Sequence, residues 1–193
     1  MNRFPRILAA LLGLVSFTVA AIAQTPATPA PQQAASPAPP TARPADVASA
    51  DAIVAALYDV ISGPAGQKRD WDRFRSLFIT GARLIPAGAP RAGATGPRVL
   101  SPDDYATASG ANLEKNGFFE KEVSRKSERF GGVLHTFSTY ESRHTAQDPA
   151  PFARGINSIQ LYWDGTRWWV VTVYWQAERT DLPLPPEFLP AAK

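Results

Sequence analysis

Two glutamates and a histidine that could transfer protons lie on two predicted strands joined by Gly131-Gly132. Paired glycines between strand-like segments are typical of a two-residue hairpin loop. With that loop, Glu122 faces Glu141, and Glu128 faces His135. If facing carboxylates lie in a desolvated cavity, the pKa of one of them rises, as general acid–base catalysis requires. Glu122, Glu141 and His135 are therefore the candidate catalytic residues.

The same residues also fit a solvated, charged face of the sheet. Lys121, Arg125 or Arg143 would then neutralise the two glutamates, and His135 would form a surface pair with Glu128. A one-residue bulge in either strand would change every pairing beyond it. Both interpretations stay open at the level of the sequence.

Asn157, Thr172 and Tyr174 are candidate ligand-binding residues on a second hairpin, closed by Asp164-Gly165. This dipeptide is the strongest short-range signal for a two-residue loop. One face of the hairpin is then apolar near the turn and ends in these three polar side chains, which suits a core that opens into a polar-lined cavity. Alternatively, the three side chains only satisfy one another or backbone groups. The apolar pairs near the turn are Leu161 with Trp168 and Ile159 with Val170.

The elements that must position these residues are helices first and strands afterwards. Helical spacing of apolar residues predicts a helix over 48–62 and a short one that begins at Asp70. Ser101-Pro102 begins a further helix, which ends at Asn116-Gly117. Tyr58 and Tyr105 lie on these helices, and Tyr105 is a further candidate ligand-binding residue. A brief strand is predicted over 83–86, and four long strands over 118–130, 133–145, 152–163 and 166–176. This order predicts an α+β fold.

The N-terminus has the pattern of a cleavable signal peptide over residues 1–23. Arg3 and Arg6 precede an apolar stretch, and Ala21-Ile22-Ala23 is a cleavage motif that places the cut near Ala23. We therefore expect a periplasmic or secreted protein with no stable membrane insertion after cleavage; an uncleaved anchor is the alternative. The chain has no cysteine, which excludes both a lipid-modified cysteine and disulfide bonds.

Composition divides the remaining chain into a linker over 24–45, a domain over 46–180 and a Pro-rich tail over 181–193. The linker is rich in Ala and Pro and has almost no large apolar side chain, so we expect it to be disordered. The net charge of +3 comes from Arg3, Arg6 and Arg43, which precede the domain. The domain itself is neutral and has no basic stripe for nucleic acid or anionic lipid.

Several segments of the domain form one pattern: Asp70–Phe74 with Phe78, Phe118–Glu122, Phe137–Arg143, Arg154–Leu161, Trp168-Trp169 and Trp175-Gln176. With these segments the chain resembles the nuclear transport factor 2-like superfamily, which includes ketosteroid isomerase, scytalone dehydratase and the polyketide cyclases, and within it an exported subgroup of unassigned function. The resemblance implies N-terminal helices packed in a curved, mainly antiparallel sheet that forms a conical cavity. Ketosteroid isomerase-like sites use an aspartate base and a tyrosine hydroxyl, and no aspartate here matches the strand position of that base.

The resemblance also implies a homodimer, because related folds commonly dimerise through the outer face of the sheet. Four large side chains make the second face of the Asp164-Gly165 hairpin too apolar for bare solvent: Trp169, Val171, Val173 and Trp175. Coverage of this face by the linker or by the C-terminal tail is the alternative.

Two functions follow from these patterns. The first is an exported small-molecule-binding or accessory module, whose partner is a small apolar or amphipathic molecule or another protein. The alternative is a cofactor-independent isomerase, dehydratase or cyclase that uses carboxylate and histidine acid–base chemistry. The sequence has no zinc pattern, phosphate loop, nucleophile elbow or dinucleotide fingerprint, so we expect neither a metal nor a cofactor.

Overall fold

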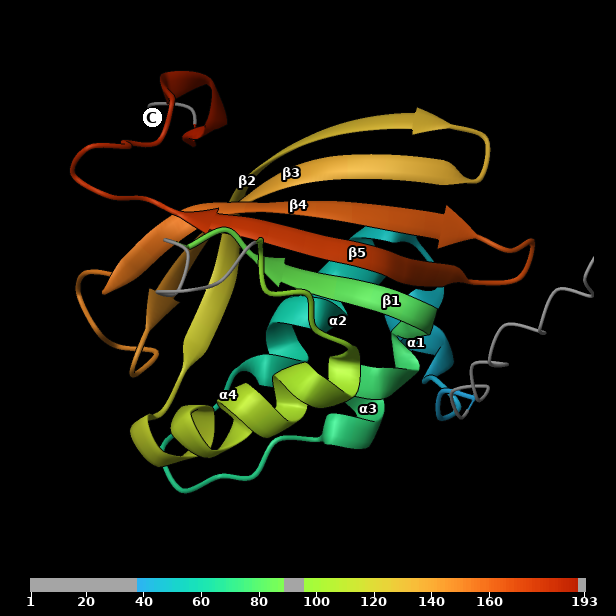
Figure 1. The fold of residues 1–193 in the computed structure, drawn as a ribbon, viewed down its shortest axis with the longest axis horizontal. Coiled ribbons are helices and arrows are strands. Elements are labelled where there is room, and N and C mark those ends of the chain that lie inside the picture. The colour runs from blue at the N-terminus through green and yellow to red at the C-terminus, as the bar shows by residue number, and fades with distance from the viewer. Residues whose placement is uncertain (1–37, 89–95, 191–193) are drawn as a thin grey trace, which may run out of the picture. The chain divides into compact units, whose positions relative to one another are not determined.

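A computed structural model describes residues 38–88 and 96–190, which all belong to one compact unit (Figure 1). The predicted signal peptide and residues 24–37 of the predicted linker lie outside the described residues. The described elements are α1 (Pro44–Val47), α2 (Ala50–Ile61), α3 (Trp71–Ser76), β1 (Phe78–Pro86), α4 (Pro102–Asn116), β2 (Phe119–Phe130), β3 (Val133–Arg143), β4 (Ala153–Trp163), β5 (Trp168–Ala177) and the 3₁₀ helix η1 (Pro186–Phe188). None of the helices in this part of the chain is long and apolar enough to cross a membrane.

Helices α2, α3 and α4 begin where polar caps predict. Ser49 and Asp70 accept backbone hydrogen bonds at the starts of α2 and α3. At the start of α4, Ser101 and Asp104 each accept a hydrogen bond from the other's backbone, which is a capping box. Helix α1 begins at Pro44, inside the segment predicted to be linker, and Ala42 already packs against the core.

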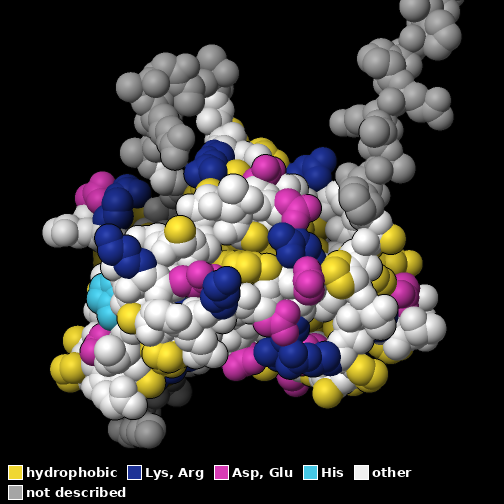
Figure 2. Space-filling model, turned by 90° about the horizontal axis from the view of Figure 1, so that it is seen from below, with side chains coloured by type: hydrophobic (Ala, Val, Ile, Leu, Met, Phe, Trp, Pro, Cys, Tyr) yellow, Lys and Arg dark blue, Asp and Glu magenta, His cyan; other side chains and the backbone are white. Residues whose placement is uncertain are grey.

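The five strands form one sheet in the order β1-β5-β4-β3-β2, in which β1 is parallel to β5 and the other pairs are antiparallel. Figure 1 shows α2, α3 and α4 on one face of this curved sheet, so the predicted α+β class is confirmed. Core side chains with at most 1% exposure fill the space between helices and sheet, among them Ile53, Phe74, Leu77, Ile159 and Val170. Figure 2 shows basic and acidic side chains interspersed over the face of the molecule that it presents.

The β2–β3 hairpin has the predicted register only near its turn. Glu128 lies opposite His135 as expected. The register shifts between Glu122 and Ser124, so that Glu122 lies opposite Tyr140, and Glu141 lies opposite Lys121. A bulge of this kind inserts one residue and changes which side chains face each other. The predicted pair of facing carboxylates, Glu122 and Glu141, is therefore wrong.

The β4–β5 hairpin differs from prediction at its turn. Its last pair is Trp163 with Trp168, so the loop holds four residues rather than two. The Asp164 side chain stabilises this longer loop, because its Oδ1 accepts hydrogen bonds from the backbone N–H groups of Thr166 and Arg167 at 2.7 and 2.8 Å. Leu161 consequently pairs with Val170, and the predicted pairing of Leu161 with Trp168 is wrong.

A second register shift, between Gln160 and Leu161, exchanges the two faces of β5 beyond Val170. Val173 pairs with Ile159 and is 6% exposed, whereas Tyr174 is 46% exposed. Val173 and Trp175, which were predicted for the outer face, thus belong to the inner face.

Candidate functional site

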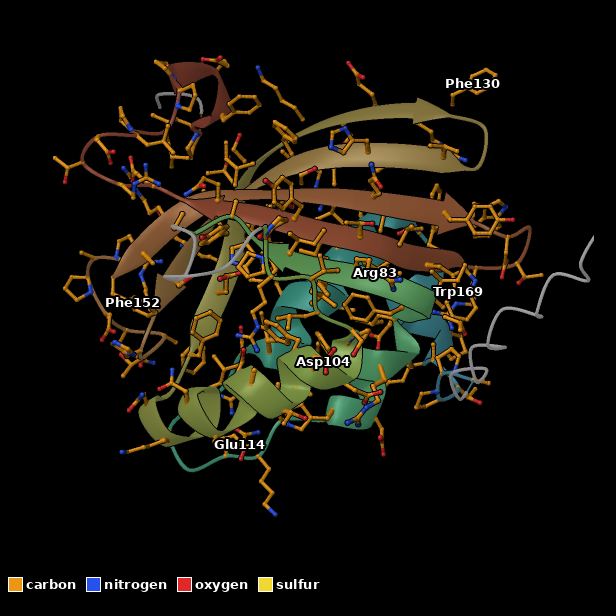
Figure 3. All side chains as sticks on the ribbon, in the orientation of Figure 1. Arg83, Asp104, Glu114, Phe130, Phe152 and Trp169 are labelled. Atoms are coloured by element: carbon orange, nitrogen blue, oxygen red, sulfur yellow. The ribbon has the colours of Figure 1, made fainter. Side chains whose placement is uncertain are left out.

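A cavity of about 460 Å³ lies between the helices and the inner face of the sheet. Its walls are mostly apolar and come from α2, α3, α4 and the strands; they include Leu57, Ile61, Phe74, Leu113, Val173 and Trp175. Eight polar side chains also line it: Tyr58, Tyr105, Ser109, Asn112, Glu120, Tyr140, Ser142 and Asn157. Phe152, which is 52% exposed, lines the cavity too, and Figure 3 shows it at the end of the sheet remote from Trp169. The cavity is an apolar site with a small, convergent polar group, as in ligand-binding pockets.

Glu120 is the one ionisable carboxyl group that lines this cavity in the described chain. Burial raises its pKa to about 7, against the opposing effect of hydrogen bonds from Ser142 and Asn157. The Ser142 hydroxyl donates to Glu120 Oε2 at 2.8 Å. Since its pKa lies near neutrality, Glu120 can hold or release a proton at ordinary pH.

Sequence reasoning missed Glu120, because the unshifted register placed it opposite Arg143. The bulge in β2 instead places it opposite Ser142, which is 2% exposed. Every second residue of this part of β3 is polar, namely Ser138, Tyr140 and Ser142, and these side chains share the inward face of the strand. This pattern is the signal that could have pointed to a polar neighbour such as Glu120.

Three tyrosines surround Glu120, one each from α2, α4 and β3. Burial raises the pKa of Tyr58, Tyr105 and Tyr140 above the usual value, and the charge of Glu120 adds to the effect. All three hydroxyls therefore stay protonated over the physiological pH range and act as neutral hydrogen-bonding groups.

Gly155 on β4 makes room for Tyr140. A Cβ atom at this position would lie 2.5 Å from the Tyr140 hydroxyl and 2.3 Å from the backbone oxygen of Gln176. Only a residue without a side chain lets the Tyr140 ring cross β4 at this point. The glycine is thus part of the polar wall of the cavity, although it contributes no side chain to it.

A side pocket, also of about 460 Å³, lies between α2 and the edge strand β2. Tyr58 and Glu120 line both this side pocket and the main cavity, and so separate the two. The side pocket carries more charged side chains than the main cavity, with Asp59, Lys121, Glu122 and Arg143 in its wall beside Ser62.

The predicted ligand-binding residues fall into two groups. Tyr105 and Asn157 line the main cavity. Thr172 and Tyr174 do not, because the bulge in the β4–β5 pair turns them outward; Thr172 lies opposite the exposed Gln160. Trp175 instead lies opposite Asn157 and lines the cavity.

None of the three predicted catalytic residues lines the main cavity. Glu141 pairs with Arg143 at 2.9 Å and with Lys121 at 3.9 Å. His135 contacts the Ser158 hydroxyl at 2.9 Å. Glu122 forms a bidentate ion pair with Arg125 and lines only the side pocket. The described residues include no group of three or more His, Asp or Glu that could hold a metal ion.

Solved structures share this fold. A protein of unknown function with a cystatin-like fold from Nostoc punctiforme is 9% identical with a TM-score of 0.51, over 66% of this chain and 87% of that one. An NTF2-like protein of unknown function from Silicibacter pomeroyi is 12% identical with a TM-score of 0.47, over 68% of this chain and 94% of that one. LinA is also 12% identical with a TM-score of 0.47, over 70% of this chain and 93% of that one. No protein-family model and no curated protein matches the chain. At such low identity the similarity shows the fold alone.

Proposed function

We propose that this chain, which has the fold of the nuclear transport factor 2-like superfamily, binds a small, largely apolar molecule in its main cavity. The observation that carries this proposal is a single carboxyl group, Glu120, inside an apolar cavity of about 460 Å³. Cavities of about 300 to 1,000 Å³ with few, convergent polar groups are typical of small-molecule sites. Glu120, Tyr105 and Tyr140 would contact the polar group of the ligand.

The charge state of Glu120 decides which ligands it accepts. With a pKa of about 7, both forms of the carboxyl group are populated at neutral pH. The protonated form donates to a carbonyl oxygen, whereas the carboxylate accepts from a hydroxyl or an amine. The cavity therefore suits a small apolar molecule that carries one carbonyl or hydroxyl group.

Binding can be measured with 2-naphthol, a neutral aromatic alcohol whose fluorescence reports whether its hydroxyl has lost a proton. We expect saturable binding to the full-length protein, and a pH dependence near 7 that disappears in Glu120→Gln. Glu141→Gln, which removes a carboxylate outside the cavity, is the matched control and should bind as the wild type does. Absence of saturable binding to the wild type would contradict the proposal.

Proton transfer is the second candidate function, and the pKa of Glu120 favours it. A general acid–base group works best when its pKa lies near the operating pH. Glu120 would remove a proton next to a carbonyl group and return it to another carbon of the same molecule, and the Tyr105 and Tyr140 hydroxyls would stabilise the enolate oxygen.

The probe for proton transfer is 2-indanone, a small ketone with acidic protons beside its carbonyl. Its deuterium exchange in D₂O, followed by NMR, should be accelerated by the wild type. Glu120→Gln should lower that rate about 100-fold or more, whereas Glu141→Gln should leave it unchanged. If both variants exchange as the wild type does, Glu120 is not the base.

We also propose that the protein is exported after cleavage near Ala23 and forms a homodimer through the sheet. Tyr162 and Tyr174, 42% and 46% exposed, support an interface on β4 and β5. The C-terminal segment covers the neighbouring part of the sheet, where Phe188 packs on Phe137. Mass spectrometry of the mature N-terminus tests export, and light scattering after size exclusion at micromolar concentration tests the dimer. If the mature protein retains residues 1–23, the export proposal is wrong. If the protein is a monomer, the dimer proposal is wrong.

A further inference from the structure

A buried chain of hydrogen bonds connects the surface of the domain with the main cavity. At its outer end Arg125 pairs with Glu122, with Nε–Oε1 and Nη2–Oε2 distances of 2.7 and 2.5 Å. Glu122 Oε1 lies 2.5 Å from the Ser138 hydroxyl, which lies 2.6 Å from the Tyr58 hydroxyl. At the inner end Asn157 Nδ2 lies 3.0 Å from the Tyr58 hydroxyl. Ser138 is 0% exposed, and Tyr58 and Asn157 are 6% and 7% exposed.

The direction of every hydrogen bond in this chain follows from the groups at its two ends. A carboxylate paired with arginine only accepts, so Ser138 donates its single proton to Glu122. Ser138 must then accept from Tyr58, which thereby uses its only hydroxyl proton. The Tyr58 oxygen in turn accepts from the Asn157 amide, which also hydrogen-bonds Glu120.

We propose that Glu122 and Ser138 are positioning residues that fix the direction of this chain, so that Tyr58 donates no proton to Glu120 or to a ligand. Tyr58 is then not among the donors available to a cavity ligand, which include Tyr105, Tyr140 and the protonated form of Glu120. This inference deepens the proposed function. What it implies for ligands rests on the proposal that the main cavity binds a small molecule.

The consequence for Glu120 follows from its surroundings. The titratable groups that face it are Tyr58 from α2, Tyr105 from α4 and Tyr140 from β3, and the charged groups of the side pocket are Asp59, Lys121, Glu122 and Arg143. If the Ser138 acceptor is removed, the Tyr58 hydroxyl is free to turn its proton toward Glu120, whose charge already acts on Tyr58. A hydrogen bond donated to the charged form of a carboxyl group lowers its pKa.

The test is the pKa of Glu120 in the ligand-free, full-length protein, measured by ¹³C NMR of the labelled carboxyl group and assigned with Glu120→Gln. Ser138→Ala should lower this pKa by about one unit. The conservative Ser138→Thr keeps the hydroxyl and should restore the wild-type value. Thr136→Val is the matched control, since Thr136 is a buried hydroxyl on the same strand that bonds Ser127 and the Lys126 backbone instead. It should leave the pKa of Glu120 unchanged.

A double substitution isolates the Tyr58 proton from general disturbance of the core. With Tyr58→Phe in the background there is no proton to redirect, so Ser138→Ala should no longer lower the pKa of Glu120. An unchanged pKa in folded Ser138→Ala, or an equal fall in the double variant, would overturn the inference. If Ser138→Ala does not fold, Glu122→Gln takes its place. The pKa of Glu120 is then compared between Glu122→Gln alone and Glu122→Gln combined with Tyr58→Phe.

The outcome is separable from that of the proposed function. The pKa measurement uses no ligand, whereas ligand binding is measured with 2-naphthol. A Tyr58-dependent shift without 2-naphthol binding sustains the hydrogen-bond chain and contradicts the binding function. Binding without the shift contradicts only the chain.

Discussion

Glu120 and Ser142 lie directly opposite each other across β2 and β3, and the serine hydroxyl donates to the glutamate at 2.8 Å. The pair lies on the inner face of the sheet, where burial raises the pKa of the carboxyl group to about 7 in spite of that hydrogen bond. The polar wall of the cavity is thus organised around one carboxyl group whose pKa lies near neutrality.

The first prediction concerns the pH dependence of stability. The pKa of Glu120 is about 7 in the folded state and about 4.5 in the unfolded state, so between these values the folded state binds more protons. Stability therefore falls as the pH rises from 4.5 to 7. Glu120→Gln lacks this loss. Its free energy of unfolding relative to that of the wild type should therefore rise by up to about 3 kcal/mol between pH 4 and pH 8. Urea unfolding at both pH values checks this, and an equal difference at both would contradict it.

The second prediction concerns Gly155. Gly155→Ala should destabilise the domain by about 2–3 kcal/mol, because the added Cβ meets the Gln176 backbone oxygen and the Tyr140 ring. Gly131→Ala is the control for a glycine with open space around it: its φ of +56° is unfavourable for alanine, but no atom lies within 4 Å of the added Cβ. It should cost about 1 kcal/mol. Equal losses in chemical denaturation would show that close packing at Gly155 is unimportant.

The third prediction tests which face of β5 lines the cavity. Trp175→Ala removes a large part of the apolar wall and should weaken 2-naphthol binding about tenfold. Tyr174→Ala changes the outward neighbour and should bind 2-naphthol as the wild type does. Fluorescence titration measures the dissociation constant of 2-naphthol for both variants. A larger effect of Tyr174→Ala than of Trp175→Ala would support the unshifted register instead.

The fourth prediction concerns the four-residue β4–β5 loop. Asp164 accepts hydrogen bonds from Trp169 Nε1 at 2.6 Å, from the Thr166 hydroxyl and from the backbone N–H groups of Arg167 and Thr166, and these hold its pKa well below the usual range. Because the folded pKa is lowered, the stabilisation is present above about pH 4 and is lost as the pH falls below it. Asp164→Ala should therefore lower the Tm at pH 7, and the difference from the wild type should shrink as the pH approaches 2. A constant difference across that range would mean that the charge of Asp164 plays no part.

Local features of the fold were predictable because they depend on neighbouring residues. Ser101 with Asp104 begins α4, Asp70 begins α3, and Gly131-Gly132 joins β2 to β3, as the sequence predicts. Each of these signals acts within a few residues: a side chain satisfies a free N–H group, or a glycine adopts a positive φ.

The candidate site was predictable only in part. Tyr105 and Asn157 line the cavity as expected, because the helix and the strand that carry them have no irregularity before those positions. Glu120, Val173 and Trp175 lie beyond register shifts, and each was assigned to the wrong partner or face.

The sequence by itself determined the α+β order of elements, the helix caps and the positions of the hairpins. Only the tertiary structure decided where the ladder shifts by one residue, near Val123 in β2 and near Val171 in β5. Side chains alternate between the two faces of a strand, so a single inserted residue exchanges inside for outside. Where that residue lies depends on packing between distant segments, such as Tyr140 against Gly155 and Tyr58 against Ser138. Those contacts bring Glu120 into the cavity.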